Sequence, residues 1–194
     1  MDEPTTWRER LLAVPDTVTR PAWRGRVALF ILAALWGASV ILGRMTEPPT
    51  VLHLTVILFH EAGHVLFAPF GEVLRVAGGT LGQLLMPIVC AVALHRHGDN
   101  FGAALACTWA SLSLVDASIY AYDAFDPVLP LIGGGTGADS AHDFVFLFER
   151  FGQLRHARGW AMLMKALGGI GLLLALAWSG AMLVLQREAV AEGG

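Results

Sequence analysis

Charged residues are scarce in this chain, and several long apolar runs contain none. Asp, Glu, Lys and Arg make up 15% of the 194 residues, hydrophobic residues make up 55%, and the mean hydropathy is +0.59. A soluble helical domain needs a polar face on its surface helices, and these runs lack one. The composition therefore argues against an ordinary soluble domain and predicts an integral membrane protein.

Basic residues and cysteines are also few. The formal net charge is −3, so the chain lacks the basic excess typical of nucleic-acid-binding proteins, and we expect no nucleic-acid partner. The two cysteines, Cys90 and Cys107, each fall within an apolar run and form no Cys-x-x-Cys motif. We therefore interpret both as reduced packing residues rather than as a disulfide or a thiolate metal site.

Five apolar runs approach the length of about 20 residues that a helix needs to cross a bilayer. They predict spans at residues 27–43, 51–70, 80–94, 101–122 and 159–185. The turns between the early spans include Gly78-Gly79. The predicted fold class is therefore all-α, a polytopic membrane bundle of about five transmembrane helices. This bundle occupies residues 27–185, between an Arg-rich leader at residues 1–26 and a polar tail at residues 186–194.

The longest connection, residues 123–158, contains a glycine run followed by the apolar residues 144–148. We interpret the latter as an interfacial helix that leads into the fifth span. If all five helices cross the membrane, nine basic residues lie on the side of the N-terminus and three on the other side. Because basic residues concentrate on the cytoplasmic side, this count predicts a cytoplasmic N-terminus and an outer C-terminus.

The motif His60-Glu61-Ala62-Gly63-His64 lies within the second predicted span. Residues four apart on a helix share one face, so His60 and His64 can reach a single metal ion. Histidine nitrogens at this spacing are typical zinc ligands, and Glu61 beside them can accept a proton from water. Because ionisable groups are costly inside a membrane and usually functional there, the motif predicts a zinc centre with Glu61 as the catalytic base.

A catalytic zinc site needs a third protein ligand, and we considered two candidates. Asp116 belongs to a polar stripe of the fourth span that also contains Tyr120 and Asp123. With five full crossings, His64 and Asp116 lie roughly 20 and 22 Å from the outer ends of their spans, so they can meet at one depth. His142 in the long connection is the alternative, provided that this loop folds back over the site.

Three further polar residues are candidates for contacting a substrate. Thr80 and Gln83 open the third predicted span in a Thr-x-x-Gln pattern, which by itself is typical of a helix capping box. Because Pro87 has no N–H to donate to the backbone carbonyl of Gln83, this carbonyl and the side-chain amide of Gln83 are left to bind a substrate strand. Tyr120, one turn from Asp116, is a candidate donor to a developing oxyanion.

On these residues, the chain resembles the site-2 protease family of intramembrane zinc metalloproteases. The resemblance consists of the motif at residues 60–64 in a membrane helix, a Gly-Gly turn and a later intramembrane aspartate. It implies a zinc ion held by His60, His64 and Asp116, with Glu61 as general base, and hydrolysis of peptide bonds in membrane-protein substrates. The chain departs from the family's second motif, which has Asn-x-x-Pro before its aspartate and Gly after it.

Residues 123–143 also resemble a group of bacterial membrane proteins, which implies the bacterial inner membrane. The expected partners are membrane lipids and either a transmembrane protein substrate or a partner subunit. Two other functions stay open, a non-catalytic subunit with a structural metal site and a hydrolase of a lipid-linked substrate. A haem site is disfavoured, because the first, fourth and fifth spans contain no histidine that could serve as a second axial ligand.

Overall fold

The computed structural model describes residues 6–15, 18–47, 50–130, 135–137 and 142–192. Within these ranges the chain forms seven α-helices and two short 3-10 helices, and its β-structure is limited to one isolated bridge between Pro130 and Thr136. In chain order the helices are α1 (Trp7–Leu12), α2 (Arg20–Leu42), α3 (Thr50–Phe67), η1 (Ala68–Phe70), α4 (Glu72–Arg96), α5 (Asn100–Asp123), α6 (Asp143–Arg150), η2 (Leu154–His156) and α7 (Ala157–Glu192). The all-α prediction is confirmed.

Five of the described helices are long and apolar enough to cross a membrane: α2, α3 continued by η1, α4, α5 and α7. Among these, α5 is the most buried and α2 the least. Large apolar side chains on the outer helices remain exposed, including Leu35, Leu58, Val89 and Leu173. Such a continuous apolar exterior suits contact with lipid rather than with water, so the chain is an integral membrane protein.

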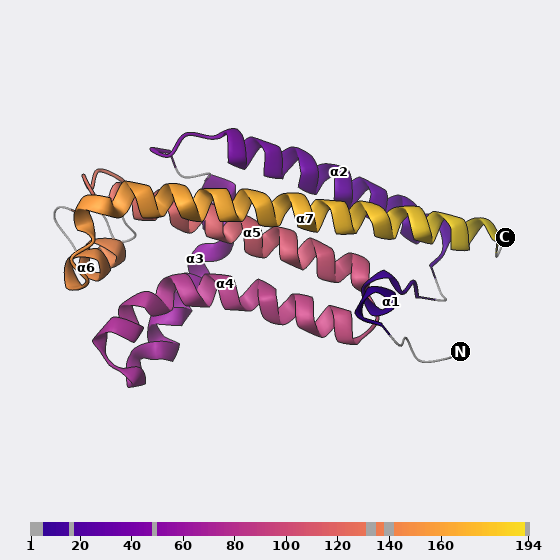
Figure 1. The fold of residues 1–194 in the computed structure, drawn as a ribbon, viewed down its shortest axis with the longest axis horizontal. Coiled ribbons are helices and arrows are strands. Elements are labelled where there is room, and N and C mark those ends of the chain that lie inside the picture. Colours follow the sequence, from indigo (N-terminus) through magenta and orange to yellow (C-terminus); the bar gives the residue numbers. More distant parts are fainter. Residues whose placement is uncertain (1–5, 16–17, 48–49, 131–134, 138–141, 193–194) are drawn as a thin grey trace.

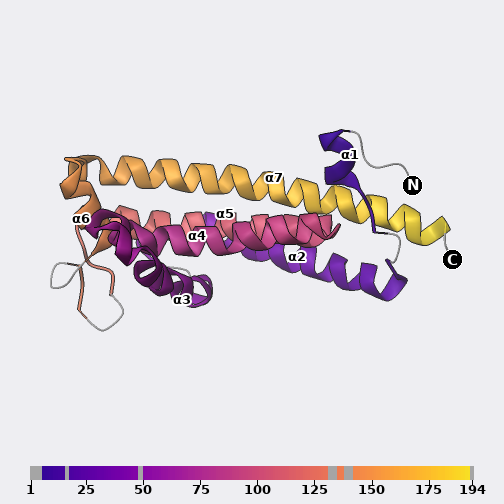
Figure 2. The ribbon, with the colours of Figure 1, turned by 90° about the horizontal axis from the view of Figure 1, so that it is seen from below.

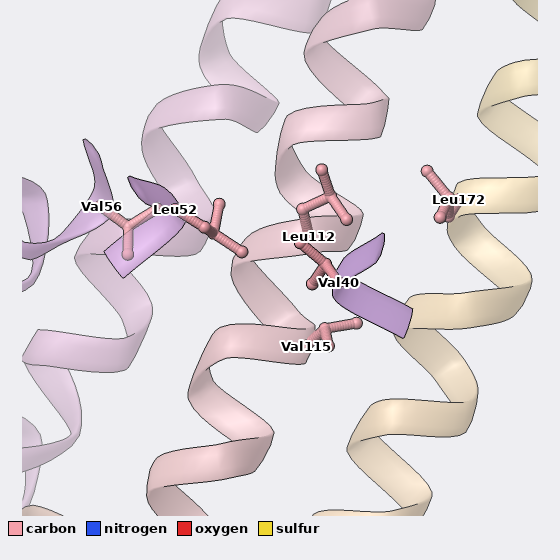
Figure 3. Packing of buried hydrophobic residues seen from close by; sticks show 6 residues of the cluster. All are labelled: Val40, Leu52, Val56, Leu112, Val115 and Leu172. Atoms are coloured by element: carbon pink, nitrogen blue, oxygen red, sulfur yellow. The ribbon is translucent and has the colours of Figure 1, made fainter. Parts of the chain in front are cut away.

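The main hydrophobic core lies where α2, α3, α5 and α7 meet (Figure 3). Its buried members are Val40, Leu52, Val56, Leu112, Val115 and Leu172. α5 supplies the two central residues of this set, which explains why it is the most buried helix. The core therefore fixes the first turns of α3 beside the middle of α5.

Both described ends of the chain lie at the same end of the bundle (Figures 1 and 2). The indole of Trp23, at the start of α2, donates a hydrogen bond to the carbonyl of Leu183 near the end of α7 (2.9 Å). The indole of Trp178 donates to the carbonyl of Leu11 in α1 (2.8 Å). Five complete crossings would put the two ends on opposite sides, so this part of the predicted N-in, C-out topology conflicts with the structure. The cytoplasmic location of the N-terminus stays a prediction.

The helix responsible for this difference is α3. It runs obliquely to the other four long helices, which lie along the long axis of the bundle (Figures 1 and 2). Its apolar sequence allows it to lie in lipid, but hydropathy carries no information about the direction in which a helix runs.

The predicted bias in basic residues disappears as a result of this course of α3, because seven basic residues lie at the end with the termini and six at the other end. The seven are Arg8, Arg10, Arg20, Arg24, Arg26, Arg96 and Arg187, and the six are Arg44, Arg75, Arg150, Arg155, Arg158 and Lys165.

The Gly78-Gly79 pair forms no turn, contrary to the prediction, because α4 continues through it. A Cβ on Gly63 would overlap the carbonyl oxygen of Gly78, and a Cβ on Gly82 would overlap that of Phe59. These glycines therefore let the backbones of α3 and α4 touch, as small residues do between membrane helices. The predicted capping box at Thr80 is also wrong, because α4 begins at Glu72 and Thr80 lies inside the helix.

The predicted boundaries of the bundle also shift. α2 begins at Arg20, inside the segment that we predicted as a leader, and α7 continues through the predicted tail to Glu192. The leader contains a further short helix, α1, whose backbone is held by the buried side chain of Asn100: its amide donates to the carbonyls of Arg10 and Ala13 (both 2.9 Å). The predicted helix after the glycine run is present as α6.

Candidate metal centre

His60 and His64 lie one turn apart on α3 and present their Nε2 atoms in the same direction. The Nδ1 atom of His60 is 2.9 Å from Oε1 of Gln83, and that of His64 is 2.8 Å from the carbonyl oxygen of Arg75. Both partners are acceptors, so each Nδ1 carries the proton and donates it. Each Nε2 is then left with a free lone pair, which is how histidines are usually held for metal binding.

The third residue of the centre is Asp143, the first residue of α6, which we did not single out from the sequence. Its Oδ2 atom is 2.9 Å from Nε2 of His60 and 3.2 Å from Nε2 of His64. Atoms bound to one tetrahedral zinc ion at about 2 Å would be about 3.3 Å apart. The three residues therefore have the donor types of a three-ligand zinc site, and both distances from the carboxylate to the imidazoles fit such a site.

The charges in this cluster support the same interpretation. Two nitrogen lone pairs and one carboxylate oxygen face one another, and the side chains of His60 and Asp143 are only 8% and 15% exposed. Three acceptors at this distance repel each other unless a cation, either a metal ion or bound protons, lies between them. Two imidazoles and a carboxylate are a donor set that catalytic zinc sites use. The residues therefore fit a zinc ion.

Glu61 adjoins this cluster from the open side. A carboxylate oxygen of Glu61 and one ring nitrogen from each of His60 and His64 all lie within 4.8 Å of one another. Its side chain is exposed and makes no hydrogen bond or ion pair with the described residues. A carboxylate that is near the two histidines but otherwise unpaired is available to accept a proton.

Gln83 has a role that the sequence did not predict. It is buried inside α4, where its Nε2 donates to the carbonyl of Ser113 on α5 (2.9 Å) while its Oε1 accepts from His60. Both ends of the amide are thus occupied, so the structure does not leave Gln83 free for a substrate. Thr80, the other predicted substrate residue, lies half-buried in the interior of α4.

Asp116 is not brought to the predicted metal site. Its two carboxylate oxygens lie 3.3 and 3.4 Å from Nδ1 of His53, which is two helical turns, or about 10 Å, before His60 on α3. A shared depth of His64 and Asp116 requires α3 to run parallel to α5, whereas α3 is oblique. Among the described residues, Glu61 lies in one group with His60 and His64, whereas Asp116 lies outside that group.

His142 is buried beside the site but turns away from it. Its ring stacks on Tyr120, with 4.0 Å between centroids, and its Nε2 faces Oδ2 of Asp123 at 3.4 Å. Burial lowers the pKa of His142, although the nearby carboxylates of Asp123 and Asp143 act in the opposite direction. The structure therefore gives His142 an uncharged supporting position next to Asp143 instead of a ligand position.

Tyr120 lies at the edge of the centre, with its ring centroid 6.1 Å from that of His60. Its hydroxyl oxygen accepts a hydrogen bond from the backbone N–H of Asp143 (3.2 Å), which leaves its own proton available for a further partner. The position is compatible with the predicted role as a donor to a substrate oxygen. That role stays a prediction.

Comparison with known proteins gives no relative, since no family model, curated protein or solved structure matches the chain. The resemblance to site-2 proteases therefore stays a prediction that rests on the sequence motif at residues 60–64.

Proposed function

We propose that this membrane protein is a zinc metallohydrolase that cleaves peptide bonds of other membrane proteins. The observation that carries the proposal is the convergence of Nε2 of His60, Nε2 of His64 and Oδ2 of Asp143, with the exposed Glu61 close to the two histidines. The site-2 protease resemblance supports the same reaction class. The resemblance of residues 123–143 to bacterial membrane proteins supports an inner-membrane location.

The proposed mechanism assigns a separate task to each residue. A zinc ion held by the two histidines and Asp143 would supply Lewis acidity, which activates water and polarises a substrate carbonyl. Glu61 accepts the proton of the attacking water and returns it to the leaving amine. The hydroxyl of Tyr120 donates a hydrogen bond to the carbonyl oxygen of the substrate as this oxygen becomes negative.

The open coordination favours an enzyme over a non-catalytic subunit. Structural zinc sites are usually closed by four protein ligands, whereas catalytic sites keep one position open. Here three ligands converge, and the side chain of His64 is still 21% exposed next to the exposed Glu61. A hydrolase of a lipid-linked substrate would use the same residues, so the substrate must be tested directly.

The test uses the whole protein purified in detergent and reconstituted in vesicles. We expect the wild type to bind one zinc ion and to cleave a labelled single-span membrane protein. Glu61→Gln should keep the zinc but lose cleavage by roughly 10²–10⁴-fold, since it removes only the general base. His60→Ala should lose the zinc as well. Loss of zinc in Glu61→Gln would show that Glu61 is a ligand, and zinc-loaded wild type that cleaves no protein substrate would refute the peptidase proposal.

A further inference from the structure

Asp143 differs from the other two proposed ligands in the element that carries it. His60 and His64 belong to one long helix, whose backbone fixes their spacing. Asp143 instead opens the eight-residue helix α6, which follows the long connection after α5. Ordering a ligand on such a segment costs conformational entropy, so other contacts must hold it in place.

His142, the residue before Asp143, provides the first of these contacts. It is the N-cap of α6, and its Nδ1 accepts a hydrogen bond from the backbone N–H of Val145 (3.3 Å). A neutral imidazole that accepts at Nδ1 carries its proton on Nε2. Oδ2 of Asp123 lies 3.4 Å from that Nε2 atom, which is close enough for an electrostatic contact, and both atoms are buried without a hydrogen-bond partner in the described ranges.

Asp123, the last residue of α5, holds the other end of the connection. Its Oδ1 atom accepts hydrogen bonds from the backbone N–H groups of Val128 (3.0 Å) and Leu129 (3.1 Å). One carboxylate therefore contacts both the start of the connection and His142, the residue before Asp143. Because Asp123 is the last residue of α5, these contacts hold both segments against the central helix of the bundle.

Tyr120, one turn before Asp123 on α5, completes the arrangement. Its ring stacks on that of His142 at an interplanar angle of 23°, and its hydroxyl accepts from the backbone N–H of Asp143. The stacking fixes the plane of the imidazole, and the hydrogen bond fixes the backbone of the ligand itself. These contacts come from α5 and do not involve the carboxylate of Asp143, which remains directed at the two histidines.

We propose that Tyr120, Asp123 and His142 form a clamp that positions Asp143 as the third ligand of the metal centre. Asp123 and His142 are positioning residues, because their contacts reach Asp143 only through the residues around it. Tyr120 positions Asp143 through its backbone N–H, and its own hydroxyl proton remains available for the donor role proposed above. The inference rests on the proposed metal centre, but it does not depend on which bond the protein hydrolyses. The clamp also explains why His142, at the start of α6, and Asp123, at the end of α5, are both buried.

The test is binding of Co²⁺ alone to the full-length protein in detergent, because the visible absorption of this ion reports its coordination geometry. His142→Asn keeps a side chain that can cap α6 but removes the ring and its contact with Asp123. We expect it to weaken Co²⁺ binding by about 10–100-fold, as changes behind metal ligands typically do, and to shift the absorption bands. Asp143→Ala removes the ligand itself and should weaken binding further.

His53→Asn is the matched control, because it removes the same ring from another histidine–carboxylate pair, two helical turns from His60 on α3. It should leave the Co²⁺ spectrum unchanged. If His142→Asn does not fold, Asp123→Asn is used instead. The oxygen of the asparagine can still accept from the N–H groups of Val128 and Leu129, and its amide nitrogen then faces Nε2–H of His142, so two donors oppose each other. A folded clamp variant with wild-type affinity and spectrum would refute the clamp. Wild type that binds Co²⁺ but has no peptidase activity would instead refute only the proposed reaction.

Discussion

At the residue scale, Gln83 connects three helices through one amide. It lies on α4, donates to the carbonyl of Ser113 on α5 and accepts from Nδ1 of His60 on α3. Because the Ser113 carbonyl can only accept, the amide nitrogen must face it and the amide oxygen must face His60. Gln83 thereby determines which nitrogen of His60 carries the proton, and so keeps Nε2 free for the metal.

Replacement of Gln83 should therefore affect the metal more than the fold. Gln83→Leu, which fills a similar volume without polar atoms, should weaken zinc affinity by about 10–100-fold. Gln83→Glu keeps an acceptor for His60 and should retain most of that affinity. Competition with a chromophoric zinc chelator measures both variants, and equal affinities would show that the hydrogen bond to His60 does not influence the metal.

The same scale shows which parts of the site could be predicted from sequence. His60, Glu61 and His64 were accessible because helical periodicity alone places them together. Asp143 was not, since its position depends on how a glycine-containing connection returns to α3, and no periodicity relates the two segments. His142, one residue away, was a candidate from its sequence, but the ligand chemistry of two neighbouring residues does not show which of them faces the site.

At the element scale, the contact between α3 and α4 determines the geometry around His60. A Cβ on Gly63 or Gly82 would meet backbone atoms of the facing helix, and a Cβ on Gly79 would meet the His60 ring. Glycine is thus required here for close approach and not for a turn. Glycine pairs occur in both situations, which is why the sequence predicted a turn where α4 is continuous, although the existence of each long helix was predicted correctly from its apolar length.

We expect Gly63→Ala to destabilise the protein by about 1–3 kcal/mol, the usual cost of overpacking, because the backbone of Gly78 cannot move aside as a side chain could. Gly25→Ala in α2 is the control. Its Cβ would meet no atom within 4 Å, and alanine should stabilise that helix by about 0.5–1 kcal/mol. Unfolding in mixed detergent micelles measures the two effects, and similar stabilities for both variants would show that the α3–α4 contact tolerates a methyl group.

At the scale of the whole molecule, the two ends of the bundle have different roles. The end with the termini is closed by α1, and the chain is tied across it by the hydrogen bonds of Trp23, Asn100 and Trp178. The other end holds α6, the metal centre and the exposed Glu61. Because basic residues are divided almost equally between the ends, their count does not orient the bundle in the membrane.

The arrangement of the ends nevertheless makes a testable prediction about topology. Single cysteines placed at the exposed positions Arg8 and Arg187, in a variant without the two native cysteines, should react with a membrane-impermeant maleimide from the same side of the membrane. A cysteine at the exposed Asp126, beyond the end of α5, should react from the opposite side. This outcome requires that α3 adds no net crossing, as its oblique course implies.

Labelling of the cysteines at positions 8 and 187 from opposite sides would mean that α3 crosses the membrane fully, and that the contact between Trp23 and Leu183 does not form in the bilayer. Since the matched depth of His64 and Asp116 follows from that same full crossing, the experiment also tests why Asp143 rather than Asp116 reaches the two histidines.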